Sequence, residues 1–354
     1  MDECGGVDAP LNKRVRPAVG KTSAAGNRSA GDDMSEVSLR HIYGPVPSRR
    51  LGRSLGIDLV PFKTCTYDCV YCQLGRITNK TIERREYVPV AEILEELKRK
   101  LAGKDNPDYI TIAGSGEPTL NSCIGELIAA IKRMTMVPVA VLTNGSLLWM
   151  CEVQGALMEA DLVLPSLDIG DERLFRCVNR PHADISFERM VEGLASFTAR
   201  FPGEVRLEVM LLAGVTGIPS EAEKIAALAR RIRASRIQLN TVSRPPVEEF
   251  AFPLSTEQVN TLKGLFPGEV EIITEQESES AQLAGFGEAK VEEVLALLRR
   301  RPSTPEDVAK GLGIHVAEAL KLLESLVKVR RVATVIAGGK TFYRAAGPTE
   351  SPPP

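Results

Sequence analysis

Short apolar runs alternate with amphipathic helical patterns along most of the chain, and this alternation constrains the fold more than any other feature. Each run is rich in β-branched residues and bounded by turn residues, as expected for parallel strands covered on both faces. A strand followed by a helix, repeated six times, favours an α/β barrel or an open α/β sheet. The expected strands span residues 55–60, 109–113, 137–142, 162–167, 205–212 and 236–242.

Between these runs, apolar residues recur at helical spacing. The expected helices lie at 90–101 and 124–131 and near 184–199, 220–233 and 255–265. In both architectures the loops that follow the strand carboxyl ends converge on one side. Functional side chains are therefore expected directly after the strands.

The two ends of the chain differ in composition from the region of alternating strands and helices between them. Residues 1–38 contain no Phe, Trp or Tyr and are dominated by Gly, Ala, Ser, Asp and basic residues. Such a segment buries too little apolar surface to offset its ordering entropy. We expect a disordered leader over 1–38, with a start at Met34 as the alternative, and a disordered Pro-rich tail over 347–354.

Residues 288–346 read as a separate small domain. Three helical patterns are followed by two β-rich runs around Gly338-Gly339, which is the order of a winged helix. The segment carries 11 Lys and Arg against 7 Asp and Glu, a net charge of +4. The helices are expected near 291–298, from 304 and over 316–327, and the hairpin over 331–336 and 340–344.

Bulk composition excludes several classes of protein. Lys and Arg number 44 against 46 Asp and Glu, a net charge of −2, so the whole chain is no polyanion binder by bulk charge. No apolar stretch reaches the roughly 18–20 residues of a membrane helix, and no apolar signal core is present near the first residue. The seven cysteines are odd in number, which suits a reducing compartment and a metal better than disulfides. We expect a cytoplasmic protein.

Three of these cysteines form the run Cys65-Thr-Tyr-Asp-Cys69-Val-Tyr-Cys72, just after a predicted strand. Three thiolates on one short loop can bind three corners of a cubane iron–sulfur cluster and leave the fourth iron without a protein ligand. Zinc would require a fourth Cys or His at close spacing, and none is nearby. Chance core cysteines are the alternative, which the close spacing disfavours.

The cysteine run resembles the loop of the radical S-adenosylmethionine superfamily, with Tyr71 in its aromatic position. Further superfamily elements follow successive strands in order, and the resemblance covers about residues 42–285. They are Gly114-Ser115-Gly116-Glu117-Pro118, Thr143-Asn144-Gly145 and Ser166-Leu167-Asp168.

The resemblance implies a partial (β/α)6 barrel over 40–287, followed by the winged helix. It implies a [4Fe–4S] cluster on Cys65, Cys69 and Cys72, whose open iron chelates S-adenosylmethionine and whose electron cleaves it to a 5′-deoxyadenosyl radical. It further implies an electron donor such as flavodoxin or ferredoxin. The implied S-adenosylmethionine site comprises Tyr71, Gly114, Gly116, Glu117, Asn144, Ser166 and Asp168.

Elementary chemistry agrees with this set. Glycines allow the backbone to approach the methionyl ammonium, and the Glu117 carboxylate could help to hold it. Asn144 and Asp168 offer short polar side chains at strand ends, where ribose hydroxyls and carboxylates could be bound.

A narrower resemblance links residues 44–58, 72–75 and 238–246 to the radical enzymes related to the tRNA wyosine-base synthases. Those synthases carry an extra upstream cysteine set, whereas this chain has only Cys4 before Cys65. This departure argues against wyosine formation itself. A tRNA or a protein bound through the winged helix is the expected macromolecular partner, with Lys321, Lys328, Arg330, Arg331 and Lys340 as the phosphate contacts.

Four arginines are candidate substrate ligands, because a guanidinium clamps carboxylates and phosphates; a solvated basic rim is the alternative. The cysteines in or near helical segments are expected to be core residues, with Cys177 as the better candidate for a hydrogen-atom donor. A non-catalytic iron–sulfur sensor that binds DNA through the winged helix is the alternative function, but it leaves the other superfamily elements unexplained. The arginines are Arg49, Arg50, Arg53 and Arg244, and the cysteines are Cys123, Cys151 and Cys177.

Overall fold

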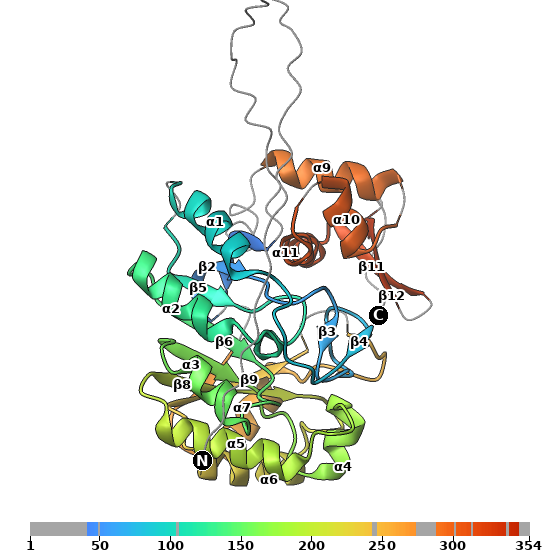
Figure 1. The fold of residues 1–354 in the computed structure, drawn as a ribbon. Helices are drawn as coiled ribbons and strands as arrows, with labels where there is room; N and C mark the ends of the chain where they lie inside the picture. The colour runs from blue at the N-terminus through green and yellow to red at the C-terminus, as the bar shows by residue number, and fades with distance from the viewer. Residues whose placement is uncertain are drawn as a thin grey trace, which may run out of the picture. The chain divides into compact units, whose positions relative to one another are not determined.

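Strands that follow one another along the chain lie side by side in one large sheet of the computed structural model (Figure 1). The order is β1-β2-β5-β6-β7-β8-β9-β10, in which β1 is antiparallel to β2 and the other pairs are parallel. Winding in chain order is typical of a barrel, whereas a doubly wound sheet reverses its order. The α/β prediction is confirmed, and the largely parallel sheet is consistent with a partial barrel. The structure describes residues 41–48, 50–103, 106–242, 246–273, 288–300, 302–312, 314–337 and 340–346.

The six predicted strands are present with ends shifted by a few residues, since their apolar patterns match strand geometry. In β8, for example, Val205, Leu207, Val209 and Leu211 are buried while the residues between them are partly exposed. The strands are β1 (Ile42–Ser48), β2 (Gly52–Ile57), β5 (Tyr109–Ile112), β6 (Val139–Thr143), β7 (Leu162–Pro165), β8 (Glu204–Leu211), β9 (Arg236–Thr241) and β10 (Val270–Ile272), with the short pair β3 (Thr64–Cys65) and β4 (Asn79–Lys80).

Two strands of the sheet were not predicted. Strand β1 contains Gly44, Pro45 and Pro47, residues that argue against a strand unless it lies at a sheet edge, as β1 does. Strand β10 has only three residues, all partly exposed, so it has no apolar run to reveal it.

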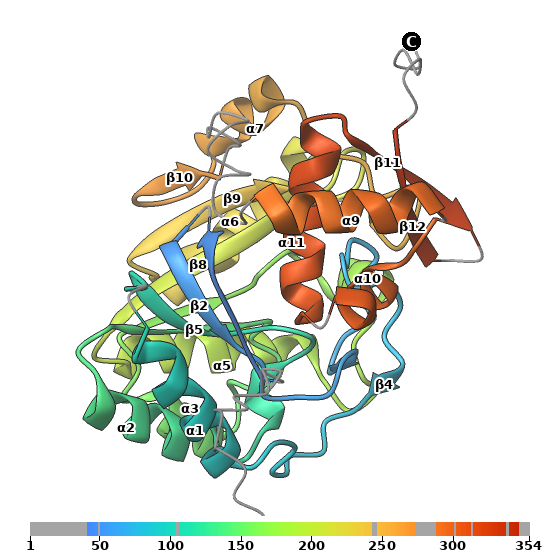
Figure 2. The same ribbon diagram turned by 90° about the horizontal axis from the view of Figure 1, so that it is seen from above.

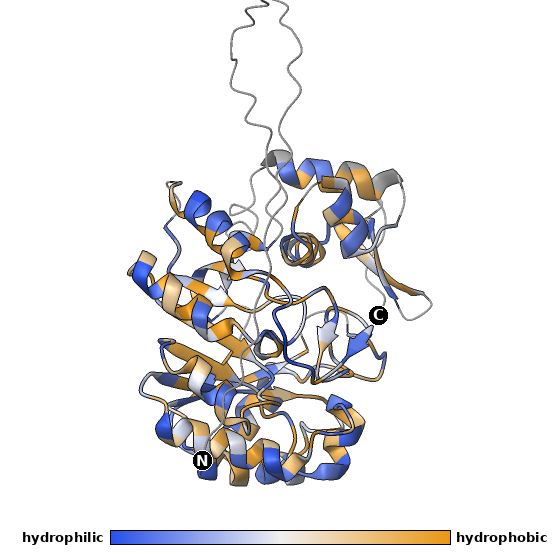
Figure 3. Ribbon diagram, viewed as in Figure 1, coloured by the Kyte–Doolittle hydropathy of each residue, from blue (hydrophilic) through white to orange (hydrophobic). Residues whose placement is uncertain are grey.

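The predicted helices are also present, and they pack an apolar stripe against the sheet. Helix α2 buries Ile124, Leu127, Ile128 and Ile131, which share one face. Figure 3 shows the apolar strands and the mixed hydropathy of the helices. The helices are α1 (Val90–Leu101), α2 (Ile124–Met134), α3 (Cys151–Leu157), α4 (Glu172–Leu174), α5 (Phe187–Arg200), α6 (Pro219–Ile232) and α7 (Thr256–Lys263), with a 3₁₀ turn (Pro118–Leu120) and a π-helical turn (Phe175–Asn179).

The C-terminal elements are three helices and an antiparallel hairpin, in the predicted order and with a core of their own. Helix α11 also contacts strand β1 of the large sheet (Figure 2). The leader 1–38, the tail 347–354 and residues 274–287 at the expected domain boundary lie outside the described residues. No helix in the described part of the chain is long and apolar enough to cross a membrane. These elements are α9 (Glu288–Arg300), α10 (Pro305–Leu312), α11 (Val316–Lys328), β11 (Val332–Ala337) and β12 (Lys340–Ala345).

Candidate functional site

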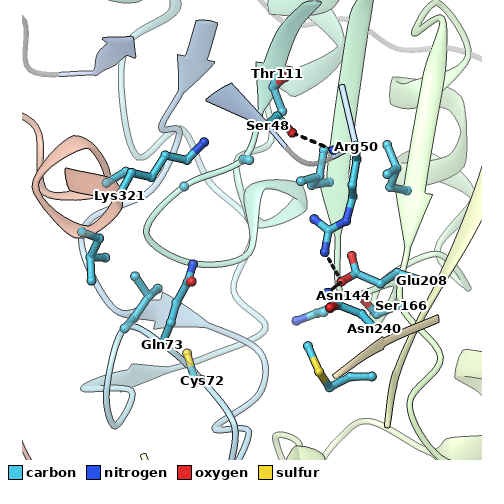
Figure 4. A pocket seen from close by; sticks show the side chains of 18 of the residues that line it. Ser48, Arg50, Cys72, Gln73, Thr111, Asn144, Ser166, Glu208, Asn240 and Lys321 are labelled. Atoms are coloured by element: carbon cyan, nitrogen blue, oxygen red, sulfur yellow. Dashed lines mark hydrogen bonds and ion pairs between the residues drawn. The ribbon is translucent and has the colours of Figure 1, made fainter. Parts of the chain in front are cut away.

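A cavity of about 450 Å³ opens at the carboxyl ends of the parallel strands (Figure 4). Its wall includes residues at or just beyond the ends of β5, β6, β7, β8 and β9, where the loops of successive βα units converge. The sequence-predicted residues on this wall are Cys65, Cys69, Cys72, Tyr71, Gly114, Gly116, Glu117, Asn144, Ser166 and Arg50, together with Lys321 and Lys328, which were predicted as phosphate contacts.

The three thiols of the cysteine run all face this cavity. Cys65 ends strand β3, and the Cys72 amide donates to the Cys69 carbonyl at 3.1 Å, which turns the loop back on itself. Burial raises the pKa of Cys65 to about 12, with a further contribution from the nearby Glu117 carboxylate. Burial likewise raises the pKa of Cys72 to about 11 and that of Cys69 well above its ordinary value.

Two amides already point hydrogens at these sulfurs. Asn144 Nδ2 lies 3.5 Å from the Cys65 Sγ, and Asn179 Nδ2 lies 3.4 Å from the Cys69 Sγ. The Tyr67 hydroxyl, inside the same loop, is buried without a hydrogen-bond partner. Donors directed at thiolates and sulfides stabilise iron–sulfur clusters.

The donor set therefore fits a cluster. Within the described ranges, no three Cys, His, Asp or Glu side chains form a group that holds a single metal ion. A four-iron cluster does not require such convergence, because each thiolate binds a different iron. Cys65, Cys69 and Cys72 would hold three irons.

The glycine-rich turn after β5 lies against the cysteine loop. Gly114 has φ +132°, which an L side chain rarely adopts. A Cβ on Gly116 would come within 1.8 Å of the Thr64 carbonyl oxygen, which also accepts the Glu117 amide at 3.1 Å. The missing side chain therefore permits the turn to pair with strand β3 beside Cys65.

Glu117 lines the cavity, but both of its carboxylate oxygens accept hydrogen bonds from the protein. Oε1 accepts from the Thr119 amide at 3.0 Å and from the hydroxyls of Thr119 and Thr143, both at 2.6 Å. Oε2 accepts from the Asn144 amide at 2.7 Å. Burial raises the pKa of Glu117, and these hydrogen bonds oppose the shift. The carboxylate thus ties the turn after β5 to the end of β6.

Asp168 lies behind the cavity wall, where it holds Tyr71. Its Oδ2 accepts the Tyr71 hydroxyl and Asn179 Nδ2 (3.1 Å), and its Oδ1 accepts the Met210 amide at 2.9 Å. The side chain is 4% exposed, and burial raises its pKa to about 6. Unlike Ser166, which follows the same strand, Asp168 is not part of the cavity wall.

Of the four predicted arginines, the two that the structure describes lie in different places. Arg50 lines the cavity and forms an ion pair with Glu208 on β8 (Figure 4). Arg53 is exposed on β2 and is not on the cavity wall; its amide donates to Asp108 at 2.6 Å. Arg49 and Arg244 lie outside the described residues.

Sequence reasoning missed Glu208 and Asn240 as cavity residues. Asn240 Nδ2 donates to Glu208 Oε1 at 3.1 Å, so both belong to the group around Arg50. Glu208 lies on the partly exposed face of β8, which also carries Glu204 and Arg206, so the alternating pattern gave no signal that set it apart. Asn240 is a buried polar residue next to the carboxyl end of β9, a position that could have indicated a functional side chain.

The other described cysteines lie apart from the cavity wall. Cys151 and Cys177 are exposed, so the expectation of core residues is wrong for these two, whereas the partly buried Cys123 packs against the larger apolar core. The helical periodicity that placed them near helices did not show which face they occupy. Cys177, in the π-helical turn, is not positioned to donate a hydrogen atom into the cavity.

Comparisons with known proteins agree with these features. Residues 59–233 match the family model of the radical SAM superfamily. The chain is 33% identical over 306 residues to a UPF0026 protein of Methanocaldococcus jannaschii, covering 85% of this chain and 94% of that protein. It is 34% identical over 318 residues to a UPF0026 protein of Helicobacter pylori strain J99, covering 88% and 100%.

A protein of Brachyspira hyodysenteriae named GTPase Obg is 39% identical over 310 residues, or 87% of this chain, but the chain spans only 46% of its length. Among solved structures, a radical SAM methyltransferase from Sphaerobacter thermophilus matches with TM-score 0.45 and 18% identity over 62% of this chain and 66% of that chain. The protein anSMEcpe with bound AdoMet matches with TM-score 0.46 and 16% identity over 62% and 63%. Because the matches to the UPF0026 proteins extend over nearly their whole length, the chain belongs to the UPF0026 family.

Proposed function

We propose that this chain is an enzyme that reductively cleaves S-adenosylmethionine, with a [4Fe–4S] cluster held by Cys65, Cys69 and Cys72. One observation carries the proposal: a single cavity contains all three thiols, the glycine-rich turn and the polar strand ends. When bound, the cluster supplies the electron that cleaves the sulfonium to a 5′-deoxyadenosyl radical.

The chain's own residues position the cofactor and exclude water. Gly114 and Gly116 let backbone groups approach the methionyl end, while Asn144 and Ser166 offer hydrogen bonds at two strand ends. Tyr71 contributes one wall, since Asp168 holds its hydroxyl. The walls shield a reactive intermediate from solvent.

The electron must come from outside the chain, and we propose a flavodoxin or a ferredoxin in the reducing cytoplasm as its source. The resemblance to the enzymes related to the tRNA wyosine-base synthases makes tRNA modification one proposed reaction. The C-terminal domain is proposed to be a winged helix. A DNA-binding iron–sulfur sensor is disfavoured, because it gives the glycine-rich turn and the polar strand ends no task.

The test is anaerobic reconstitution followed by reduction in the presence of S-adenosylmethionine. Wild-type protein should bind about four irons and four sulfides per chain and release 5′-deoxyadenosine. Cys65→Ala, Cys69→Ala and Cys72→Ala should each abolish the brown chromophore, whereas Cys151→Ala, on an exposed thiol, should not. A full cluster without 5′-deoxyadenosine would favour the sensor, and equal loss in Cys151→Ala would reject the three ligands.

A further inference from the structure

One face of helix α11 lines the cavity. Its cavity residues recur at intervals of three and four positions, which is one side of an α-helix. The opposite side packs into the C-terminal core, so every residue of α11 is buried or partly buried. The cavity-facing residues are Ala317, Leu320, Lys321, Glu324, Ser325 and Lys328.

Leu320 and Lys321 show that this face is turned inward. Leu320 is 3% exposed although it lines the cavity and is not part of the C-terminal core cluster, so the cavity wall at this position is buried. In Figure 4 the Lys321 side chain extends from its helix into the cavity, across from Arg50 and Glu208. A helix that binds nucleic acid presents such a face to solvent.

His315 joins the start of α11 to the large sheet. Its Nδ1 accepts the Ala317 amide at 3.1 Å and so caps the helix. Its Nε2 lies 3.4 Å from Asp58 Oδ2, and its ring stacks on Tyr43 with 4.7 Å between centroids. The side chains of His315 and Asp58 are only 8% and 7% exposed, so this contact is shielded from water.

Asp58 carries the link onward to the glycine-rich turn. The same Oδ2 accepts the Ser115 amide at 3.1 Å. The turn lies so close that a Cβ on Gly114 would come within 2.7 Å of the Asp58 carboxyl carbon. The cap of α11 and the turn proposed to bind S-adenosylmethionine therefore share one buried carboxylate. A second contact, Lys63 Nζ to Glu306 Oε1 at 3.2 Å, also joins the C-terminal domain to the loop before Cys65.

We propose that α11 is the substrate-facing wall of the cavity and that His315 is the positioning residue that seats it on the glycine-rich turn. The proposal rests on the proposed function for the identity of the cofactor. The domain then acts inward on a substrate within the cavity, and Lys321 and Lys328 do not contact nucleic-acid phosphates. When the contact between His315 and Asp58 is lost, both helix α11 and the glycine-rich turn become more mobile.

Hydrogen exchange on the full-length apo-protein tests the seating without any cofactor. His315→Asn keeps an N-cap oxygen but is too short to reach Asp58 and lacks the ring. Amides in 114–117 and 316–328 should exchange faster by on the order of tenfold, as expected when one buried polar contact is lost. His315→Gln, which retains a donor long enough for Asp58, should restore slow exchange in 114–117.

His182→Asn is the matched control, because His182 Nδ1 caps its own loop by accepting the Asp184 amide at 3.3 Å and does not contact α11. It should leave both segments unchanged. Unchanged exchange in His315→Asn would overturn the proposal.

In the reconstituted protein, His315→Asn should keep its iron and lose on the order of tenfold in 5′-deoxyadenosine yield. If the wild type yields none, the proposed function fails while the exchange result stands.

Binding of tRNA and duplex DNA across a salt series tests whether the lysines of α11 face the cavity or a nucleic acid. Lys321→Ala and Lys328→Ala should bind like the wild type and like Lys310→Ala, an exposed lysine on α10. Absence of binding by all four proteins agrees with an inward helix. Weaker binding by the α11 variants, with a salt slope reduced by about one per lysine, would overturn it.

Discussion

Glu117 is a buried carboxylate with two possible tasks, holding the methionyl ammonium or holding the protein. Four hydrogen bonds from Thr119, Thr143 and Asn144 argue for the second. Glu117→Ala should lower the free energy of unfolding of the apo-protein by about 2–4 kcal/mol, because several buried donors lose their acceptor. Glu117→Gln should lose less, since one side-chain oxygen remains, but its amide would face the Asn144 N–H.

Denaturant unfolding measures this effect, with the exposed Glu126→Gln as control, expected within about 0.5 kcal/mol of wild type. If Glu117→Gln unfolds like the wild type but loses S-adenosylmethionine affinity, the carboxylate binds the cofactor directly.

Asp168 gives the apo-protein a pH-dependent stability. Its folded pKa of about 6 lies above the ordinary 3.8, so the folded state binds more protons between these values. Stability from this group is full below about pH 4 and falls as pH rises to about 6. Asp168→Asn, which cannot titrate, should lack that fall. Unfolding free energies of both proteins from pH 4 to 7 provide the measurement, and parallel curves would refute it.

At the scale of elements, strand β3 depends on the turn after β5 for its position. Gly116→Ala would force a Cβ to within 1.8 Å of the Thr64 carbonyl, which belongs to backbone and cannot move alone. We expect β3 and the cysteine loop to shift, with a lower melting temperature and less iron after reconstitution.

Gly155→Ala is the control for that change. It lies in helix α3 with nothing within 4 Å of the added Cβ, so it should raise stability by up to about 1 kcal/mol. Full iron loading and unchanged melting of Gly116→Ala would show that the close approach is not required.

At the scale of the whole molecule, the apolar clusters formed by the described residues do not depend on an iron–sulfur cluster for their packing. The three cysteines line the cavity, and only Cys65 and Cys69 pack against the edge of the larger core. Removal of iron by a chelator should therefore leave the far-ultraviolet circular dichroism and cooperative unfolding intact, unlike a zinc finger, whose metal supplies its folding energy. Loss of cooperative unfolding on chelation would contradict this expectation.

The spacing of residues along the chain was sufficient to predict most of the fold and the part of the site that lies in the cysteine loop and directly after the strands. The period of apolar residues depends only on neighbours along the chain, so the strands, the main helices and the cysteine loop were predictable. The glycine-rich turn and Asn144 were predictable for the same reason, because each follows a strand whose end was already located. Pro residues in β1 and the shortness of β10 concealed the sheet edges.

Tertiary structure decided what spacing does not encode, because it depends on how distant segments pack. Arg50 and Glu208 are 158 positions apart, and only the closure of the sheet brings them together. Packing likewise places donors from the end of β6 against the Glu117 carboxylate. It also places Asp168 behind the cavity wall, where its carboxylate accepts the Tyr71 hydroxyl. The sequence by itself determined which elements form and which residues follow the strands. The contact of His315 with Asp58, and with it the inward face of α11, required the packing of the C-terminal domain on the sheet.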